Sequence, residues 1–278
     1  MIETIFLNVL WQVIAFIGCV YLVGFLISLI NRLFYKLANY SRAVVYGTGF
    51  IGTPVHETSH LLMCLVFFHK VHKVKFFQIN DEDGVLGYVS HSWNPKNIYQ
   101  QIGNYFIGIA PIVVGTLIIF LGMKQFLPVT YGEIDSYFAE FAVMQEKGFS
   151  WDWFGYIFSM FGGMTKAIFA EFSIGWQWWV FMVISLCIAI HMNLSGADIK
   201  GSLVAIPIMI VVFIAVNLVL GLVFGSIYGA FIETVNVGAS FLLCTLILSL
   251  ALSVLCLAVA IVIKLIILLI KTLFGIGR

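Results

Sequence analysis

The chain has 278 residues, of which 62% are apolar and only 10% are charged, and its mean hydropathy is +1.08. Because soluble domains carry about 25% charged residues, this composition excludes a water-soluble globular enzyme. The 14 basic and 13 acidic residues leave a net charge of +1, which is not the basic surface of a nucleic-acid-binding protein. We therefore predict an all-α, polytopic membrane protein that forms a single integral membrane domain over residues 1–278.

Six stretches are apolar and long enough to cross a bilayer, since a spanning helix takes about 20 apolar residues. These predicted spans are 5–30, 44–68, 102–123, 176–194, 203–228 and 238–263. The first has no formal charge and no basic residues before it, so we expect a retained helix rather than a signal peptide. The second is unusual for a span, because it contains His56, Glu57 and His60.

A small β-hairpin is predicted at the membrane face, between the second and third spans. Residues 71–79 alternate in polarity, and Asn-Asp-Glu-Asp-Gly at 80–84 is a strong turn signal. Residues 85–90 can then return as the second strand. Three histidines near this hairpin are expected to be solvated rather than to bind metal: His69, His72 and His91.

Residues 154–170 are apolar apart from Lys166, but the pair Gly162-Gly163 interrupts them. Five tryptophans flank this segment: Trp151, Trp153, Trp176, Trp178 and Trp179. Tryptophan is enriched where a membrane meets water. We therefore expect an interfacial helix here rather than a seventh span.

The balance of Lys and Arg between the predicted loops leans toward cytoplasmic termini and a cytoplasmic hairpin. We expect a multi-pass protein of the bacterial cytoplasmic membrane, in direct contact with the lipid bilayer. Five cysteines lie in apolar runs without a close pair, so they are predicted to be buried free thiols rather than a disulfide framework. The sequence specifies no oligomeric state.

The strongest motif is His-Glu-Thr-Ser-His at residues 56–60, which matches H-E-x-x-H. On a helix, positions i and i+4 share one face, so His56 and His60 can bind one metal ion with Glu57 beside them. Ionisable residues inside a membrane are costly and usually face a cavity or a partner. A bound zinc ion would offset the cost of placing these three side chains inside the membrane. The alternative is a hydrogen-bonded polar cluster that holds helices together.

A catalytic zinc ion has three protein ligands and one open position. Asp198 is the first candidate for the third ligand, because it is the only acidic residue within 172–232. Its segment would have to fold back toward the bilayer to reach the metal. His191 competes for the role, and His191 or Asn193 could instead orient a ligand or stabilise the oxyanion. The alternative for Asp198 is an interfacial ion pair with Lys200.

These features together resemble the site-2 protease family of intramembrane zinc metallopeptidases. The resemblance covers approximately residues 44–201 and rests on H-E-x-x-H in an early span, the hairpin, the pair Ala110-Pro111, and the element from Asn193 to Asp198. Three flanking helices lie outside this core: 5–30, 203–228 and 238–263.

The resemblance implies a role for each matching residue. His56 and His60 would bind zinc together with Asp198, and Glu57 would be the catalytic acid and base. The chain departs from the family pattern after Asn193, because no proline precedes Asp198 and two residues separate Asp198 from the next glycine. We therefore expect a divergent member of the family.

The function that follows is zinc-dependent hydrolysis of a peptide bond in a membrane-embedded or juxtamembrane substrate. Zinc would activate water, and Glu57 would act as general base and then as general acid. The implied partner is a membrane-protein or peptide substrate.

Two alternatives belong to other classes. A membrane metal transporter for zinc could line its path with the same residues, but it would favour ligands at several levels of the membrane. An inactive pseudoprotease could bind membrane segments without cutting them, although the intact Glu57 disfavours this reading.

Overall fold

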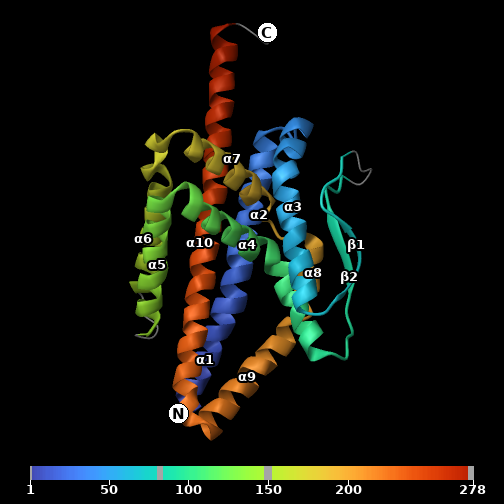
Figure 1. Cartoon of the computed structure of the whole chain (residues 1–278), viewed down its shortest axis with the longest axis vertical. Coiled ribbons are helices and arrows are strands. Elements are labelled where there is room, and N and C mark those ends of the chain that lie inside the picture. Colours follow the sequence, from blue (N-terminus) through green and yellow to red (C-terminus); the bar gives the residue numbers. More distant parts are fainter. Residues whose placement is uncertain (1, 80–83, 147–151, 275–278) are drawn as a thin grey trace.

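The computed structural model describes residues 2–79, 84–146 and 152–274, which form helices and one two-stranded sheet (Figure 1). The elements in chain order are α1 (Ile2–Val13), η1 (Ile14–Gly18), α2 (Cys19–Leu37), α3 (Arg42–Val66), β1 (Lys70–Lys75), β2 (Tyr88–Ser92), α4 (Ile98–Phe126), α5 (Pro128–Glu146), α6 (Asp152–Ala170), η2 (Phe172–Ile174), α7 (Trp176–His191), α8 (Gly196–Leu203), α9 (Ile206–Val223) and α10 (Gly225–Leu273). These elements confirm the prediction of an all-α membrane protein with one small hairpin.

Among the described residues, four helices are long and apolar enough to cross a membrane, namely Ile2–Leu37, Ile98–Phe126, Ile206–Val223 and Gly225–Leu273. The bent pair α7 and α8 raises this number to five within the described residues. Helix α3 occupies the predicted second span, but its His, Glu, Thr and Ser residues lower its hydropathy. The total of six crossings therefore stays a prediction.

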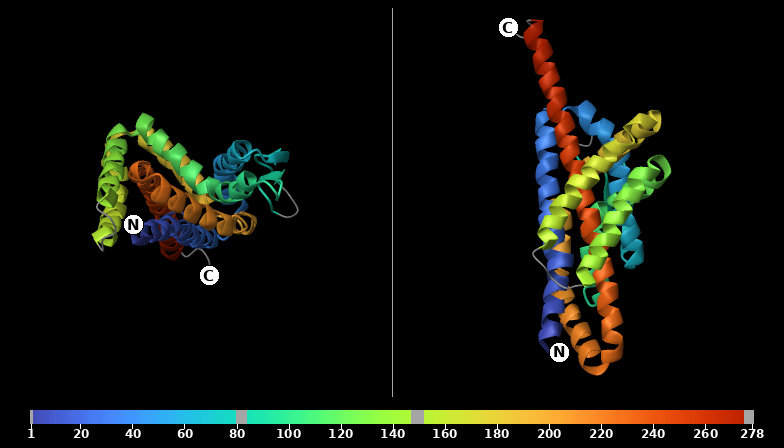
Figure 2. Two further views of the ribbon diagram at one scale, coloured as in Figure 1. Left: turned by 90° about the horizontal axis from the view of Figure 1, so that it is seen from below. Right: turned by 90° about the vertical axis from the view of Figure 1, so that its left-hand side faces the viewer.

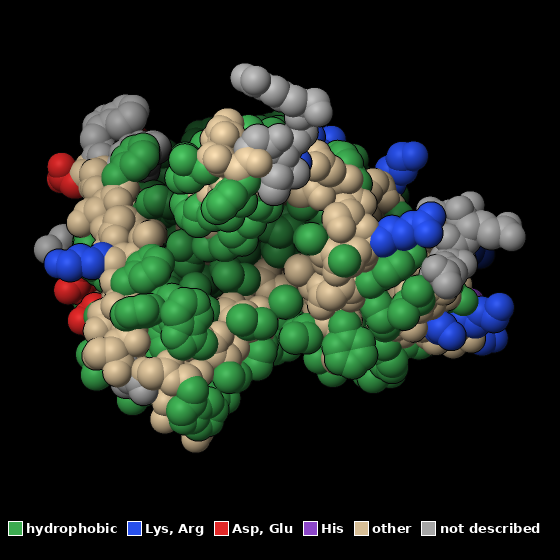
Figure 3. Space-filling model, turned by 90° about the horizontal axis from the view of Figure 1, so that it is seen from above, with side chains coloured by type: hydrophobic (Ala, Val, Ile, Leu, Met, Phe, Trp, Pro, Cys, Tyr) green, Lys and Arg blue, Asp and Glu red, His purple; other side chains and the backbone are tan. Residues whose placement is uncertain are grey.

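The surface agrees with a membrane location. Seen from above, apolar side chains cover most of the molecule, and the Lys and Arg side chains lie mainly on the side of the hairpin (Figure 3). Leu265 and Leu268 of α10 are both more than half exposed, as expected for side chains that contact lipid. The start of α1 and the end of α10 lie at opposite ends of the long axis (Figure 1). The prediction of two cytoplasmic termini, which assumed six crossings, is untested.

Helix α10 differs most from the sequence prediction. A loop was expected between the spans 203–228 and 238–263, whereas the chain breaks earlier, at the non-helical Phe224, and then stays helical to Leu273. Residues 229–237 contain no proline, and the single charge of Glu233 does not stop the helix. With 49 residues at about 1.5 Å each, α10 is about 74 Å long, more than twice the roughly 30 Å hydrocarbon core of a bilayer.

The expected interfacial helix corresponds to α6, and α5, which was not predicted, lies beside it (Figures 1 and 2). Neither helix meets the length and composition criteria for a span. The buried Met160 and Met164 of α6 belong to the apolar core that α10 shares. Trp153 and Trp178 are buried, and Trp153 packs edge-on against Trp11 of α1. The prediction that these tryptophans flank the segment at the membrane interface is therefore wrong for Trp153 and Trp178, whose rings lie in the protein interior. Trp151 lies outside the described residues.

The predicted hairpin is confirmed. Strands β1 and β2 pair antiparallel from Lys70 opposite Ser92 to Lys75 opposite Tyr88, with an irregularity between Val71 and Lys73. The strands are shorter at the turn than predicted, and β2 continues to Ser92; most of the predicted turn, 80–83, lies outside the described residues. A tight reversal with positive φ at Phe68 joins α3 to β1, so the hairpin lies beside α3 (Figure 1).

Candidate metal centre

The two histidines of the H-E-x-x-H motif face each other on α3. Their Nε2 atoms are 3.0 Å apart, and their ring centroids are separated by 4.8 Å. Both positions lie well inside the helix, so the i, i+4 spacing sets this arrangement locally. The structure therefore brings His56 and His60 together as the motif predicts.

The hydrogen-bond partner of Nδ1 determines which nitrogen of each ring carries the proton. The Nδ1 of His56 lies 2.6 Å from the backbone carbonyl oxygen of His191, and the Nδ1 of His60 lies 2.8 Å from that of Ile107. A carbonyl oxygen only accepts, so each Nδ1 carries a proton and donates it. In a neutral imidazole the other nitrogen is then an acceptor. The two Nε2 lone pairs thus face each other and require a cation or an additional proton between them.

Asp198 adds a third acceptor at the same point. Its Oδ1 lies 3.3 Å from the Nε2 of His60. Its Oδ2 accepts a hydrogen bond from the backbone N–H of Ser195, whose hydroxyl accepts the N–H of Asp198 in return. This capping box at the start of α8 holds the carboxylate in place. One ligand atom from each of His56, His60 and Asp198 lies within 4.8 Å of the other two, and two His and one carboxylate are a known zinc donor set.

A bend in the chain brings Asp198 to the histidines. Helices α7 and α8 are separated by four residues and are bent by 61° relative to each other, which supplies the change of direction that the sequence required. Helix α8 then lies against α4 at Gly108. A side chain at Gly108 would place its Cβ 2.7 Å from the carbonyl oxygen of Asp198 and 2.8 Å from the Cβ of Ser202. The glycine therefore allows the close approach that positions Asp198.

Glu57 lies beside the cluster, at the boundary between α3 and the hairpin. Its side chain is buried, and it lines a cavity of about 570 Å³ together with His56, His60 and Asp198. The opposite wall of this cavity includes Gly87 and the first residues of β2. A Cβ at Gly87 would lie 2.8 Å from the Cγ of Glu57. The carboxyl group is thus confined between the two histidines and a strand of the hairpin.

His191 contributes its backbone rather than its ring. Its Nε2 lies 3.2 Å from both the Tyr35 hydroxyl and the Thr48 hydroxyl, so the ring points away from the cluster. The His191 ring is therefore not part of this cluster, whereas its carbonyl orients the His56 ring. Asn193 is exposed and lines a smaller cavity next to His56, and it does not join the ligand cluster. Lys200 is exposed, while the Asp198 carboxylate bonds to Ser195 and approaches His60.

The histidines of the hairpin differ from the prediction in two of three cases. His72 is exposed and bonds to the hydroxyl of Ser92, as expected of a solvated residue. His69 is buried and His91 half-buried, with their Nδ1 atoms 3.0 Å apart. Burial lowers the pKa of both rings, that of His91 to about 4. Cys64 continues the i, i+4 spacing of His56 and His60 on α3, but this spacing does not predict the contact between His69 and His91.

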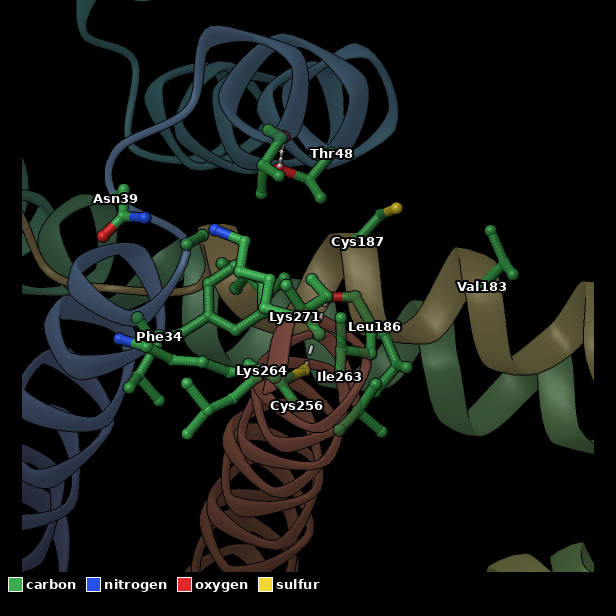
Figure 4. Close-up of a pocket in the computed structure, with 18 residues that line it drawn as sticks. Phe34, Asn39, Thr48, Val183, Leu186, Cys187, Cys256, Ile263, Lys264 and Lys271 are labelled. Carbon is green, nitrogen blue, oxygen red and sulfur yellow. Dashed lines mark hydrogen bonds between the residues drawn. The ribbon is translucent and has the colours of Figure 1, made fainter. Parts of the chain in front are cut away.

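A separate crevice of similar volume, about 570 Å³, lies between α2, α3, α7 and α10 (Figure 4). Its walls are mostly apolar, and Lys264 and Lys271 of α10 reach its edge. None of the residues of the His56 cluster lines it. Four of the five cysteines are buried and all five are free thiols, as predicted, two of them in the wall of this crevice.

Comparison of the chain with protein-family models, curated proteins and solved structures finds no match.

Proposed function

We propose that the chain is an intramembrane zinc metalloprotease that hydrolyses a peptide bond in a membrane-embedded or juxtamembrane segment. The observation that carries this proposal is the convergence of three acceptor atoms: Nε2 of His56, Nε2 of His60 and Oδ1 of Asp198. Three acceptors so close together repel one another unless they share a cation or a proton. Their donor types fit zinc, with room left in the adjoining cavity for water.

A zinc ion held there would supply Lewis-acid activation of water and of the scissile carbonyl. The chain's own contribution begins with the orientation of the two rings, which the carbonyls of His191 and Ile107 hold from behind. Such outer partners set the tautomer and raise the basicity of a metal ligand. The capping box of α8 orients the Asp198 carboxylate through the N–H of Ser195.

Glu57 is placed to move a proton in this cavity. It follows His56 directly in α3 and lines the same cavity. As general base it would accept a proton from the attacking water, and as general acid it would deliver that proton to the leaving amine. A Cβ at Gly87 would crowd the Cγ of Glu57, so this glycine leaves room for the side chain next to the hairpin.

The shape of the cavity supports an extended peptide as substrate. Residues 87–89 of the hairpin form one wall and the metal ligands form another. An unwound segment could pair with this strand, since strand addition satisfies the backbone N–H and C=O groups of the bound peptide. A helical segment would have to unwind first, because its carbonyls are already hydrogen-bonded.

The test compares wild type with Glu57→Gln and with a control at an exposed acid, Glu140→Gln on α5. Each purified protein is placed in lipid vesicles that contain a set of labelled transmembrane peptides, and cleavage and zinc content are measured. We expect Glu57→Gln to lose about 10²-fold or more in cleavage while zinc content stays equal to wild type. Cleavage that persists in Glu57→Gln, or zinc content unchanged by His56→Ala, would contradict the proposal. Zinc flux that survives in Glu57→Gln would favour a transporter.

A further inference from the structure

A second cluster of metal-ligand side chains lies one helical turn beyond His60. The Sγ of Cys64 and one nitrogen from each of His69 and His91 all lie within 4.8 Å of one another. The three residues come from α3, from the turn that follows it, and from β2. The hydrolytic role of the first cluster makes no use of them.

The geometry of the two rings suits a shared ion. The Nε2 of His69 lies 2.7 Å from the carbonyl oxygen of Gln100 and therefore donates to it, which leaves Nδ1 as an acceptor. This Nδ1 points at the Nδ1 of His91, 3.0 Å away. In a tetrahedral zinc site with one sulfur, bond lengths of about 2.0–2.3 Å place the ligand atoms roughly 3.3–3.6 Å apart. The distance between the two Nδ1 atoms is close to that spacing, and the Sγ of Cys64 lies within 4.8 Å of a nitrogen of each ring.

The surroundings hold these side chains in a built site rather than a chance contact. The backbone N–H of His69 donates to the carbonyl of Cys64 at 2.8 Å, which ties the two residues together across the reversal at Phe68. Trp93 stacks on the ring of His69 at an interplanar angle of 21°. A Cβ at Gly103 of α4 would lie 3.0 Å from the Nε2 of His69. Both Cys64 and His69 are buried.

We propose that Cys64, His69 and His91 form a second site for a transition-metal ion of the zinc type, distinct from the His56 cluster. Ions of this type bind thiolate and imidazole ligands, whereas Mg²⁺ and Ca²⁺ prefer oxygen ligands. The ion would join the end of α3 to β2. Because His91 also lines the cavity that holds Glu57, the ion would fix the strand that faces the first cluster. Metal binding here does not depend on proteolysis.

Cobalt distinguishes the two sites, because thiolate coordination adds a charge-transfer absorption and the first cluster contains no cysteine. The full chain in detergent is loaded with Co²⁺, and the same preparations are analysed for bound Zn²⁺. We expect the thiolate band in wild type, in His56→Ala and in Cys19→Ser, which changes a half-buried thiol elsewhere. We expect its loss in both Cys64→Ser and His91→Ala, with zinc falling from two ions per chain to one.

The outcomes separate this inference from the proposed function. A wild type without the thiolate band, or a band that survives in Cys64→Ser, overturns the second site. One zinc ion per chain that is lost in His56→Ala and retained in Cys64→Ser overturns it too, and leaves the proposed protease intact. Zinc that is lost in Cys64→Ser but unaffected by His56→Ala supports the second site and contradicts the protease. His91→Ala answers the same question if Cys64→Ser does not fold.

Discussion

The Nδ1–H of His60 donates to the backbone carbonyl of Ile107, and this carbonyl lacks the usual i+4 partner in its own helix. In an α-helix the carbonyl of residue i accepts the N–H of residue i+4. Four residues after Ile107 stands Pro111, inside α4, and proline has no N–H. The proline therefore leaves a buried acceptor, which the histidine of the neighbouring helix satisfies. His191, the last residue of α7, offers His56 a carbonyl that is free for a related reason, because it lies at a helix end.

Pro111→Ala tests this relationship. The new N–H would compete with His60 for the carbonyl of Ile107, so the ring would lose its fixed orientation. We expect zinc affinity at the first cluster to fall about 10–100-fold. The helix itself should gain stability, since proline in a helix interior costs about 3 kcal/mol. Zinc titration and thermal unfolding should thus move in opposite directions.

Pro207→Ala is the matched control for this change. Pro207 lies in the first turn of α9, where no intrahelical hydrogen bond is lost, so zinc affinity should stay at the wild-type value. Unchanged zinc affinity in Pro111→Ala would show that the Ile107 carbonyl does not orient His60.

His191→Ala separates the role of this residue's backbone from that of its ring. The carbonyl that accepts from His56 remains after the substitution, so zinc content should equal that of wild type. The contact of the ring's Nε2 with the Tyr35 and Thr48 hydroxyls is lost, and we expect a loss of about 1 kcal/mol of stability, because one ring nitrogen makes one hydrogen bond. Metal analysis and thermal unfolding of His191→Ala beside His56→Ala provide the measurement. A loss of zinc as complete as in His56→Ala would mean that His191 is a ligand after all.

The local parts of the metal centre could be predicted from the sequence, because they depend on helical periodicity alone. His56 and His60 are one turn apart on a single helix, and their ring contact follows from that spacing. The choice between Asp198 and His191 could not be made in this way. It depends on the 61° bend between α7 and α8, and the sequence before Asp198 does not specify such an angle.

Helix α5 and the pairing of His69 with His91 could not be predicted, because the sequence signals for them are weak or depend on distant parts of the chain. Helix α5 carries Glu133, Asp135 and Glu140, so it has no apolar run that would mark it as a span. The pairing of His69 with His91 requires the register of β1 and β2 and the irregularity within β1. Register is set by tertiary packing as well as by the turn. The sequence alone therefore predicts only a buried free thiol at Cys64.

Gly52→Ala examines how closely α3 must approach α7. A Cβ at Gly52 would overlap the carbonyl oxygen of Cys187 and would lie 2.7 Å from the Cγ of His191. The two helices would have to separate, which typically costs about 1–3 kcal/mol. The same movement would lengthen the hydrogen bond between His56 and the His191 carbonyl, so zinc affinity should also fall. Gly47→Ala, on the same helix with open space around its Cβ, should leave both quantities near wild type. Equal behaviour of the two variants would contradict the close contact.

Gly87→Ala perturbs Glu57 without changing a metal ligand. The added Cβ would lie 2.8 Å from the Cγ of Glu57 and 2.8 Å from the carbonyl of Lys75, so the carboxyl group must move away from the hairpin. We expect the cleavage rate to fall about 10-fold or more, since general acid–base catalysis contributes about 10²–10⁴-fold and depends on placement. Zinc content should stay unchanged. Gly201→Ala is the control, because Gly201 lines the same cavity and its Cβ would meet no atom within 4 Å. A cleavage rate reduced equally in both variants would mean that cavity volume, and not the position of Glu57, limits the reaction.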